Sequence, residues 1–409
     1  MKRRSFLKTS AIGAFNAGID LGLGSLLCGV SSLSFAANPE QSLKARRSAQ
    51  EGPLIVVFLR GGADGLAILS PLDDANFLAA RPPEMRFAKD KAANTDPLIL
   101  DGANFYWHPA ATPLHQLFTN KRLIAWPAVG IKDETRSHFE AQEIIERGVQ
   151  NLQSLPDSFG WMARQVYLNK NQIPPNPNAL PLFAGGNTMP RAMQGAGQVL
   201  AVRDLQGGVS FPGGAASLKA VQALAEVDNN HPAAQTMLGN FLSLDQVNTA
   251  LPKTENKVLP YVSAAQVPYP ESDPSVGLRS VARIMQANLG LEYAWVDQNG
   301  WDTHDGQPGR INYLTDQLSK ALLAFDEDMK AQNQNYKLVV LTEFGRRLIS
   351  NKSNGTDHGH GSLALVMGSQ VAGGKMQGRW HGLEANKLDR GVDLAVTTDY
   401  LELLKSLQT

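Results

Sequence analysis

The sequence has little cysteine, no excess charge of either sign and no nucleotide-binding motif. Its 409 residues include one cysteine, Cys28, which cannot form an internal disulfide and provides no cluster of thiolate ligands for zinc. Basic and acidic residues number 38 each, so no overall positive charge favours nucleic acid as a partner. Neither a phosphate-binding loop nor a dinucleotide-binding glycine motif occurs, which disfavours nucleotide-driven chemistry.

The composition is that of a folded protein with many loops. Hydrophobic residues make up 43% of the chain, which excludes intrinsic disorder. The 37 glycines and 23 prolines predict frequent turns, and enzymes commonly build their sites from loops. The length suits one large α/β domain or two smaller ones.

The N-terminal segment has the pattern of an export signal. Arg3-Arg4 precedes Phe6-Leu7-Lys8, a weakly apolar run follows, and Ser34-Phe35-Ala36 provides a cleavage site with small residues. We therefore expect residues 1–36 to be a signal peptide that the twin-arginine export machinery recognises, which predicts a periplasmic or secreted protein. Cleavage would also remove Cys28.

Two other interpretations of this segment remain. The first is a transmembrane anchor, which the polar residues Asn16 and Asp20 and several glycines and serines disfavour. The second is lipid attachment at Cys28, where Leu27 stands in place of the small residue that such a site requires. We expect no stable membrane span after cleavage.

The mature chain alternates apolar runs with helical patterns. Residues 37–52 are a polar leader, and a single domain is predicted over 53–409. Five apolar runs predict buried strands: residues 54–59, 123–126, 291–296, 338–341 and 363–367. An apolar stripe between residues 310 and 330 predicts a helix, and residues 398–407 predict a short helix with Thr398 as its cap.

This alternation predicts an α/β fold with a mainly parallel sheet covered on both faces. Two stretches rich in proline, asparagine and glycine, near 171–214 and 251–277, are predicted to be loop-rich insertions that leave the sheet.

Polar residues cluster where the predicted strands end. In an open parallel sheet ligands bind beyond the carboxyl ends of the strands. Three of the apolar runs are followed by polar residues and glycine, and a fourth is preceded by them: residues 60–65, 297–304, 342–346 and 355–361. This clustering is the strongest functional signal in the sequence.

The spacing of the histidines favours a metal site. In an extended backbone alternate residues point the same way, so Asp302 and His304 share one side, and so do His358 and His360. Such pairs suit a divalent ion such as zinc, manganese or iron. The alternative is that Asp357 caps a turn and that the histidines are solvated loop residues.

Two further motifs allow both a structural and a functional interpretation. Ser137 and Glu140 have the spacing of a capping box, but Ser137 could also be a nucleophile, or His138 a ligand, at a helix N-terminus that favours negative charge. Arg346 could bind an anionic substrate or merely balance a helix end or a solvated face.

Taken together, these motifs resemble an exported family known as domain of unknown function 1501, which is grouped with the alkaline-phosphatase-like superfamily. The resemblance runs from about residue 54 to residue 407 and is carried by six motifs: Phe58-Leu59-Arg60-Gly61-Gly62-Ala63-Asp64-Gly65, Arg136-Ser137-His138-Phe139-Glu140-Ala141-Gln142, Gly300-Trp301-Asp302-Thr303-His304, Thr342-Glu343-Phe344-Gly345-Arg346-Arg347, Gly355-Thr356-Asp357-His358-Gly359-His360-Gly361 and Thr397-Thr398-Asp399-Tyr400.

The resemblance implies a three-layer α/β/α hydrolase with two divalent metals. It implies that Ser137 is the nucleophile. Arg346, which could bind an anionic substrate, is the second candidate catalytic residue. Metal ligands are implied at six positions: Asp64, Asp302, His304, Glu343, His358 and His360. Phe344 stands where the superfamily commonly has a ligand, which is a departure from a complete two-metal site.

The leading hypothesis is therefore an exported metal-dependent hydrolase-like protein that acts on phosphate or sulfate esters. Its partner would be a small anionic ester or a surface polymer. The alternative is a non-catalytic periplasmic binding or assembly protein that keeps the hydrolase fold.

Overall fold

The computed structural model describes residues 51–154, 159–170, 179–211, 213–255 and 257–408. The predicted signal peptide, most of the polar leader and the start of the 171–214 stretch lie outside these residues.

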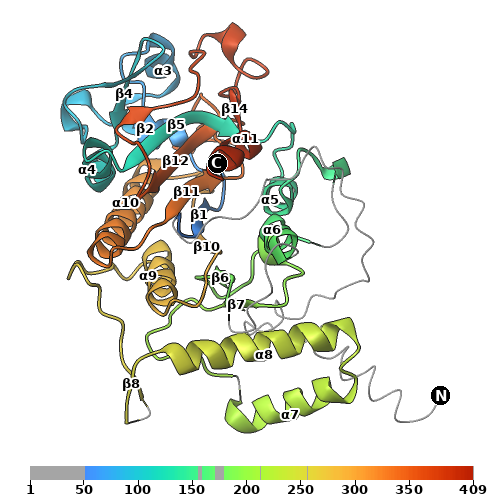
Figure 1. Cartoon of the computed structure of the whole chain (residues 1–409). Coiled ribbons are helices and arrows are strands. Elements are labelled where there is room, and N and C mark those ends of the chain that lie inside the picture. The colour runs from blue at the N-terminus through green and yellow to red at the C-terminus, as the bar shows by residue number, and fades with distance from the viewer. Residues whose placement is uncertain (1–50, 155–158, 171–178, 212, 256, 409) are drawn as a thin grey trace.

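A large, mostly parallel sheet forms the centre of the molecule (Figure 1). Its order is β13-β5-β12-β11-β1-β10-β6-β7, with β14 also paired to β5. The bounds of these strands are β1 Leu54–Leu59, β5 Leu123–Gly130, β6 Leu182–Ala184, β7 Val199–Ala201, β10 Tyr293–Gln298, β11 Lys337–Thr342, β12 Ser362–Gly368, β13 Lys375–Met376 and β14 Thr398–Asp399. All five strands predicted from apolar runs are therefore present.

Both faces of this sheet are buried, which makes three layers. Along β1, Ile55, Val57 and Leu59 belong to one apolar core, whereas Leu54, Val56 and Phe58 belong to another. Successive strand residues point to opposite faces, so the continuous apolar run results from burial on both sides. The first face is covered by α4 (Thr112–Thr119), α9 (Asp273–Gln286) and α10 (Gln307–Ala331). The second face is covered by α5 (His138–Arg147), α6 (Trp161–Lys170) and α11 (Tyr400–Ser406).

Smaller elements lie around the edges of the sheet. Helices α7 (Gly214–Val227) and α8 (Pro232–Ala250) pack against each other near β7, and both lie at the bottom of Figure 1. Other short elements include α2 Gly65–Ile68, α3 Ala75–Ala80, the three-stranded sheet of β2 Leu69–Ser70, β3 Leu98–Leu100 and β4 Ala103–Trp107, and the hairpin of β8 Lys253–Thr254 and β9 Lys257–Val258.

Strand β12 is antiparallel to its neighbours β11 and β5. Strands β1, β10 and β11 are parallel to one another, so the start of β12 lies at the same edge as their carboxyl ends. The motif before β12 thus meets the motifs that follow the other strands.

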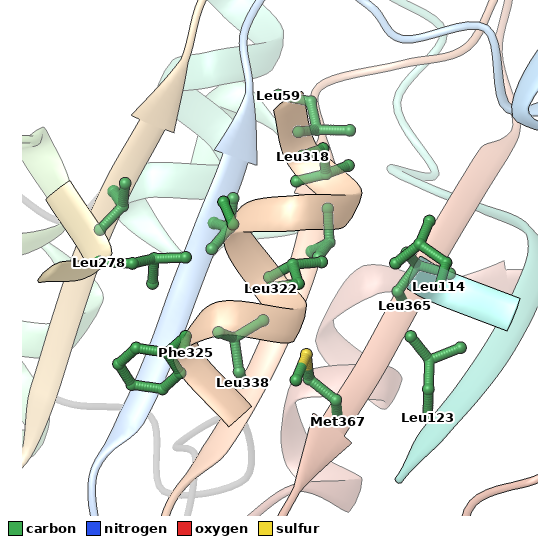
Figure 2. Close-up of a cluster of buried hydrophobic side chains, with 14 of the residues drawn as sticks. Leu59, Leu114, Leu123, Leu278, Leu318, Leu322, Phe325, Leu338, Leu365 and Met367 are labelled. Carbon is green, nitrogen blue, oxygen red and sulfur yellow. The ribbon is translucent and has the colours of Figure 1, made fainter. Parts of the chain in front are cut away.

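Helix α10 provides much of the first core. Six side chains of its apolar stripe are buried: Ile311, Leu314, Leu318, Leu322, Phe325 and Met329. In Figure 2, Leu318, Leu322 and Phe325 lie against sheet residues that include Leu338 and Leu365. The helix predicted from this periodicity is confirmed.

The structure differs from expectation in two places. Residues 179–214 contain β6 and β7, which pair in parallel with β10 and with each other, so this part of the stretch extends the sheet instead of leaving it. At the C-terminus the cap of α11 is Asp399, whose side chain accepts a hydrogen bond from the Leu401 amide, and Thr398 lies in β14.

No helix within the described ranges has both the length and the apolar composition that crossing a bilayer requires.

The packing of α10 predicts a large effect of truncation at Leu322, which is fully buried. Leu322→Ala should lower the free energy of unfolding by about 2–5 kcal/mol, because it removes apolar contacts and leaves a cavity. Denaturant unfolding measures this change. Lys330→Ala on the exposed side of the same helix is the control and should change stability by less than about 0.5 kcal/mol. Equal effects of the two variants would contradict the assignment of the core.

Candidate metal site at the strand ends

The histidines and acidic residues of three separate motifs meet at the edge of the sheet. Asp302 and His304 follow β10, His358 precedes β12, and His138 begins α5. The side chains of Asp302 and His304 are 48% and 43% exposed, whereas those of His138 and His358 are 24% and 25% exposed. The group is therefore anchored in the protein on one side and accessible from solvent on the other.

Nitrogen atoms of all three histidines converge on one carboxylate oxygen. Oδ1 of Asp302 lies 3.0 Å from Nε2 of His304, 3.3 Å from Nε2 of His358 and 3.6 Å from Nε2 of His138. Nε2 of His304 and Nε2 of His358 are 3.0 Å apart. His138, Asp302 and His358 form a group whose ligand atoms lie within 4.8 Å of one another, close enough to hold a metal ion.

The opposite ring nitrogen of each histidine faces an oxygen acceptor. Nδ1 of His138 lies 2.9 Å from Oε1 of Glu343, and Nδ1 of His304 lies 3.2 Å from Oδ1 of Asp357. Nδ1 of His358 lies 2.8 Å from the carbonyl oxygen of Arg136. These acceptors favour the tautomer with the ring proton on Nδ1, in which the lone pair lies on Nε2.

This arrangement suits a cation better than it suits an empty site. Nε2 of His138 is buried and has no hydrogen-bond partner. Two Nε2 lone pairs 3.0 Å apart, on His304 and His358, would repel each other unless a proton or a metal lies between them. Donor atoms bonded to a tetrahedral ion at about 2.0–2.1 Å are roughly 3.3 Å apart, which is the range of the separations here.

Glu343 holds His138 in place from behind. This carboxylate is fully buried and also accepts hydrogen bonds from the Gly61 amide and the Gln142 side chain. Burial raises the pKa of Glu343, but hydrogen bonds from His138 and Gln142 outweigh burial and leave the pKa below its usual value. The same hydrogen bond raises the pKa of His138 despite partial burial. A carboxylate behind a metal-ligating histidine is a common supporting arrangement in metal sites.

Arg346 is fully buried, and its guanidinium connects the loops around Asp302 through hydrogen bonds. Its guanidinium donates to Oδ1 of Asp302 at 2.5 Å and to the carbonyl oxygens of Gly61, Gly62 and Thr356. Burial raises the pKa of Asp302, but the Arg346 guanidinium and the neighbouring histidines outweigh burial, so the pKa lies below its usual value. Since the donors of Arg346 are occupied by protein oxygens, the side chain does not present a free fork to an anionic substrate.

Two glycines allow the loops to approach so closely. A Cβ atom at Gly61, where φ is +118°, would lie 2.3 Å from the Asp302 nitrogen. At Gly355 it would lie 2.1 Å from the carbonyl carbon of His304. Any larger residue would push apart the segments that carry the site.

Asp64 and His360, both predicted ligands, are engaged elsewhere. Asp64 is buried and accepts hydrogen bonds from Arg81 at 2.6 Å and from Gln307 at 2.7 Å. In His360, Nδ1 lies 2.8 Å from Oδ2 of Asp389 and Nε2 lies 2.9 Å from the carbonyl oxygen of Ile131. Both nitrogens of His360 therefore face protein oxygens, so neither is open to a metal.

Ser137 is the N-cap residue of α5, but its side chain makes no capping hydrogen bond. Glu140, expected to complete a capping box, instead accepts a hydrogen bond from the Thr135 hydroxyl. The half-buried Ser137 hydroxyl is therefore not committed to the cap, and the positive end of the helix dipole lies beside it.

Phe344 forms an apolar wall behind two of the histidines. It is fully buried, and the centroid of its ring lies 4.8 Å from that of His138 and 4.9 Å from that of His358. An aromatic ring cannot coordinate a metal, so its presence limits the donors on this side to the two imidazoles.

Several residues that support the histidines were not identified from the sequence. Gln142 lies one helical turn after His138 and shares Glu343 with it, a spacing that could have signalled the contact. Arg136 pairs with Asp389 and Asp393, and its carbonyl orients His358. No local pattern marks Asp389 or Asp393, because their role depends on contacts distant in the sequence.

Residues 204–404 match the family described as "Protein of unknown function (DUF1501)". This match includes Asp302, His304 and His358 but not His138. Among solved structures the chain is similar to the C-terminal periplasmic domain of EcEptC from Escherichia coli in complex with Zn. The identity is 9%, the alignment covers 86% of this chain and 80% of that chain, and the TM-score is 0.35.

No curated protein matches the sequence.

The buried contacts of Asp64 predict that its role is structural. Asp64→Asn should lower the free energy of unfolding by about 3–5 kcal/mol, because the Arg81 guanidinium would be left buried without its counter-charge. The metal content of the folded protein should not change. Asp90→Asn, at a side chain that is 75% exposed, is the matched control for unfolding. Loss of metal from well-folded Asp64→Asn protein would instead make Asp64 a ligand.

Proposed function

We propose that the strand-end site binds a divalent metal through His138, Asp302, His304 and His358. The observation that carries the proposal is the buried Nε2 of His138, which has no hydrogen-bond partner and lies beside the Asp302 carboxylate. Three imidazole nitrogens and one carboxylate oxygen are donors that suit zinc, manganese or iron. In this proposal Glu343 is a supporting residue rather than a ligand, and Asp64 and His360 do not bind the metal.

The proposed activity is hydrolysis of a phosphate or sulfate ester. A metal bound here would stabilise negative charge that develops on an ester oxygen. Ser137 precedes the ligand His138 at the start of α5, where a helix N-terminus favours an anion. The Ser137 hydroxyl would attack the ester or position water, and Arg346 would act indirectly by fixing Asp302.

We further propose that the chain belongs to the family that matches residues 204–404 and that its fold is alkaline-phosphatase-like. The three layers and the strand-end position of the site support this assignment. The sequence of residues 1–36 supports export by the twin-arginine route to the periplasm.

A non-catalytic binding or assembly protein is the second candidate, and Phe344 favours it. Its ring occupies the side of His138 and His358 where a further ligand would be needed for a second ion. A protein that holds one ion and hydrolyses none of a panel of chromogenic phosphate and sulfate esters would support this candidate. Metal together with turnover would support the enzyme.

Removal of one imidazole should abolish metal retention. His304→Ala protein, purified after export from its native host, should contain less than about a tenth of the wild-type metal per chain, because a site with three donors binds more weakly. Elemental analysis measures the content. His381→Ala replaces an exposed histidine outside the site and should retain the metal.

Any esterase activity of the wild type should be lost in His304→Ala and persist in His381→Ala. Equal metal content in the two folded variants would refute the site. Undiminished turnover by metal-free protein would refute the proposed chemistry and leave the binding proposal intact.

The Glu343 carboxylate should tune metal affinity without binding the ion. Glu343→Gln keeps the shape of the side chain but weakens the hydrogen bond that fixes His138, so metal affinity should fall about 10–100-fold. Competition with a metallochromic chelator measures this affinity. Glu134→Gln, at a side chain that is 80% exposed, is the control. Complete loss of binding would suggest a direct ligand, and an unchanged affinity would exclude a supporting role.

A further inference from the structure

A separate cavity lies on the α10 side of the molecule. It has a volume of about 330 Å³ and lies among α2, the chain around residues 85–91, and the start of α10. None of the four proposed metal ligands lines it. It adjoins the site region through Gln307, whose side chain accepts a hydrogen bond from Thr303, the residue between Asp302 and His304.

Basic residues line this cavity, and acidic residues do not. Nε of Arg86 donates to the carbonyl oxygen of Arg81 at 3.0 Å, which fixes the guanidinium, while its terminal nitrogens have no protein partner within the described ranges. Lys91 also lines the cavity, and its nearest ion-pair partner, Asp90, is 3.9 Å away with both side chains largely exposed. Such a distant exposed pair contributes little, so both cations are available to a ligand.

His108 adds an oriented donor. Its Nδ1 accepts a hydrogen bond from the Ala110 amide at 3.1 Å, which places the ring proton on Nε2. Burial lowers the pKa of His108 to about 4, so the ring stays neutral near pH 7 and keeps this single N–H group. The ring of Phe87 packs edge-on against it, with the centroids 5.3 Å apart.

The rest of the lining is mainly apolar and includes Ala67, Met85, Phe87 and Ile311. The N-terminus of the 25-residue helix α10 also reaches the cavity through Pro308, and the dipole of a helix favours negative charge at this end. Apolar walls with a few convergent polar donors are characteristic of small-molecule sites.

We propose that this cavity binds a small organic anion, with a carboxylate or phosphate head group held by Arg86, Lys91 and His108 and an apolar body against Met85, Phe87 and Ile311. The site is independent of the metal centre and of any hydrolytic activity.

Isothermal titration calorimetry tests the proposal with two probes, 3-phenylpropionate and phenyl phosphate, and with 3-phenyl-1-propanol as the uncharged match. At least one anion should bind the wild type, and at least about tenfold more tightly than the alcohol, because charge-assisted hydrogen bonds to the head group would be absent in the alcohol. Which of the two anions binds more tightly identifies the preferred head group.

Two variants locate the binding site. Arg86→Gln should weaken binding of the anion about tenfold or more through loss of the guanidinium. Ala88→Trp, at an exposed residue of the lining, should block the cavity and have a similar effect even if Arg86→Gln perturbs folding. His304→Ala should bind the anion as the wild type does.

The proposal would be overturned if neither anion binds, if the alcohol binds as tightly as the better anion, or if both cavity variants retain binding. Loss of binding in His304→Ala alone would place the anion at the metal site and would equally refute a separate cavity.

Discussion

The buried guanidinium of Arg346 is the constraint on which the strand-end site depends. It binds carbonyl oxygens of Gly61 and Gly62 after β1, of Trp301 after β10 and of Thr356 before β12, and it also binds the Asp302 carboxylate. A buried cation is tolerated only when its donors are satisfied, so these segments must stay together. Lysine has a single ammonium group and could not reach all of these acceptors in one planar arrangement.

A second set of contacts orients the three imidazole rings at this edge of the sheet. Each imidazole is held through Nδ1 by an oxygen from a different part of the chain: Glu343 for His138, Asp357 for His304 and the carbonyl of Arg136 for His358. Fixing one nitrogen fixes the direction of the other. The convergence of the Nε2 atoms on Asp302 therefore follows from contacts made at the other side of each ring.

The sequence predicted the position of the candidate site in the sheet better than it predicted which residues converge there. Alternation of apolar runs and helical patterns identified the sheet, and the strand-end rule identified its functional edge. Asp302 and His304 were recognisable because their spacing is local. Asp64 and His360 look equally suitable in sequence, but their partners Arg81 and Asp389 are recruited only by folding. At the start of α5 the sequence allowed either a capping box or a ligand role for His138. Only the structure shows that the Ser137 side chain makes no cap hydrogen bond.

The charge around the histidines indicates which kind of cation this site would accept. Asp302, Glu343 and Asp357 each have a lowered pKa and remain ionised near pH 7. In the described part of the chain, Arg346 is the one arginine whose guanidinium donates to any of these three carboxylate groups. Three carboxylates against one guanidinium leave this group with an excess of negative charge that a divalent ion would balance. Hard ions such as calcium prefer oxygen ligands, so three imidazole nitrogens favour a borderline transition metal.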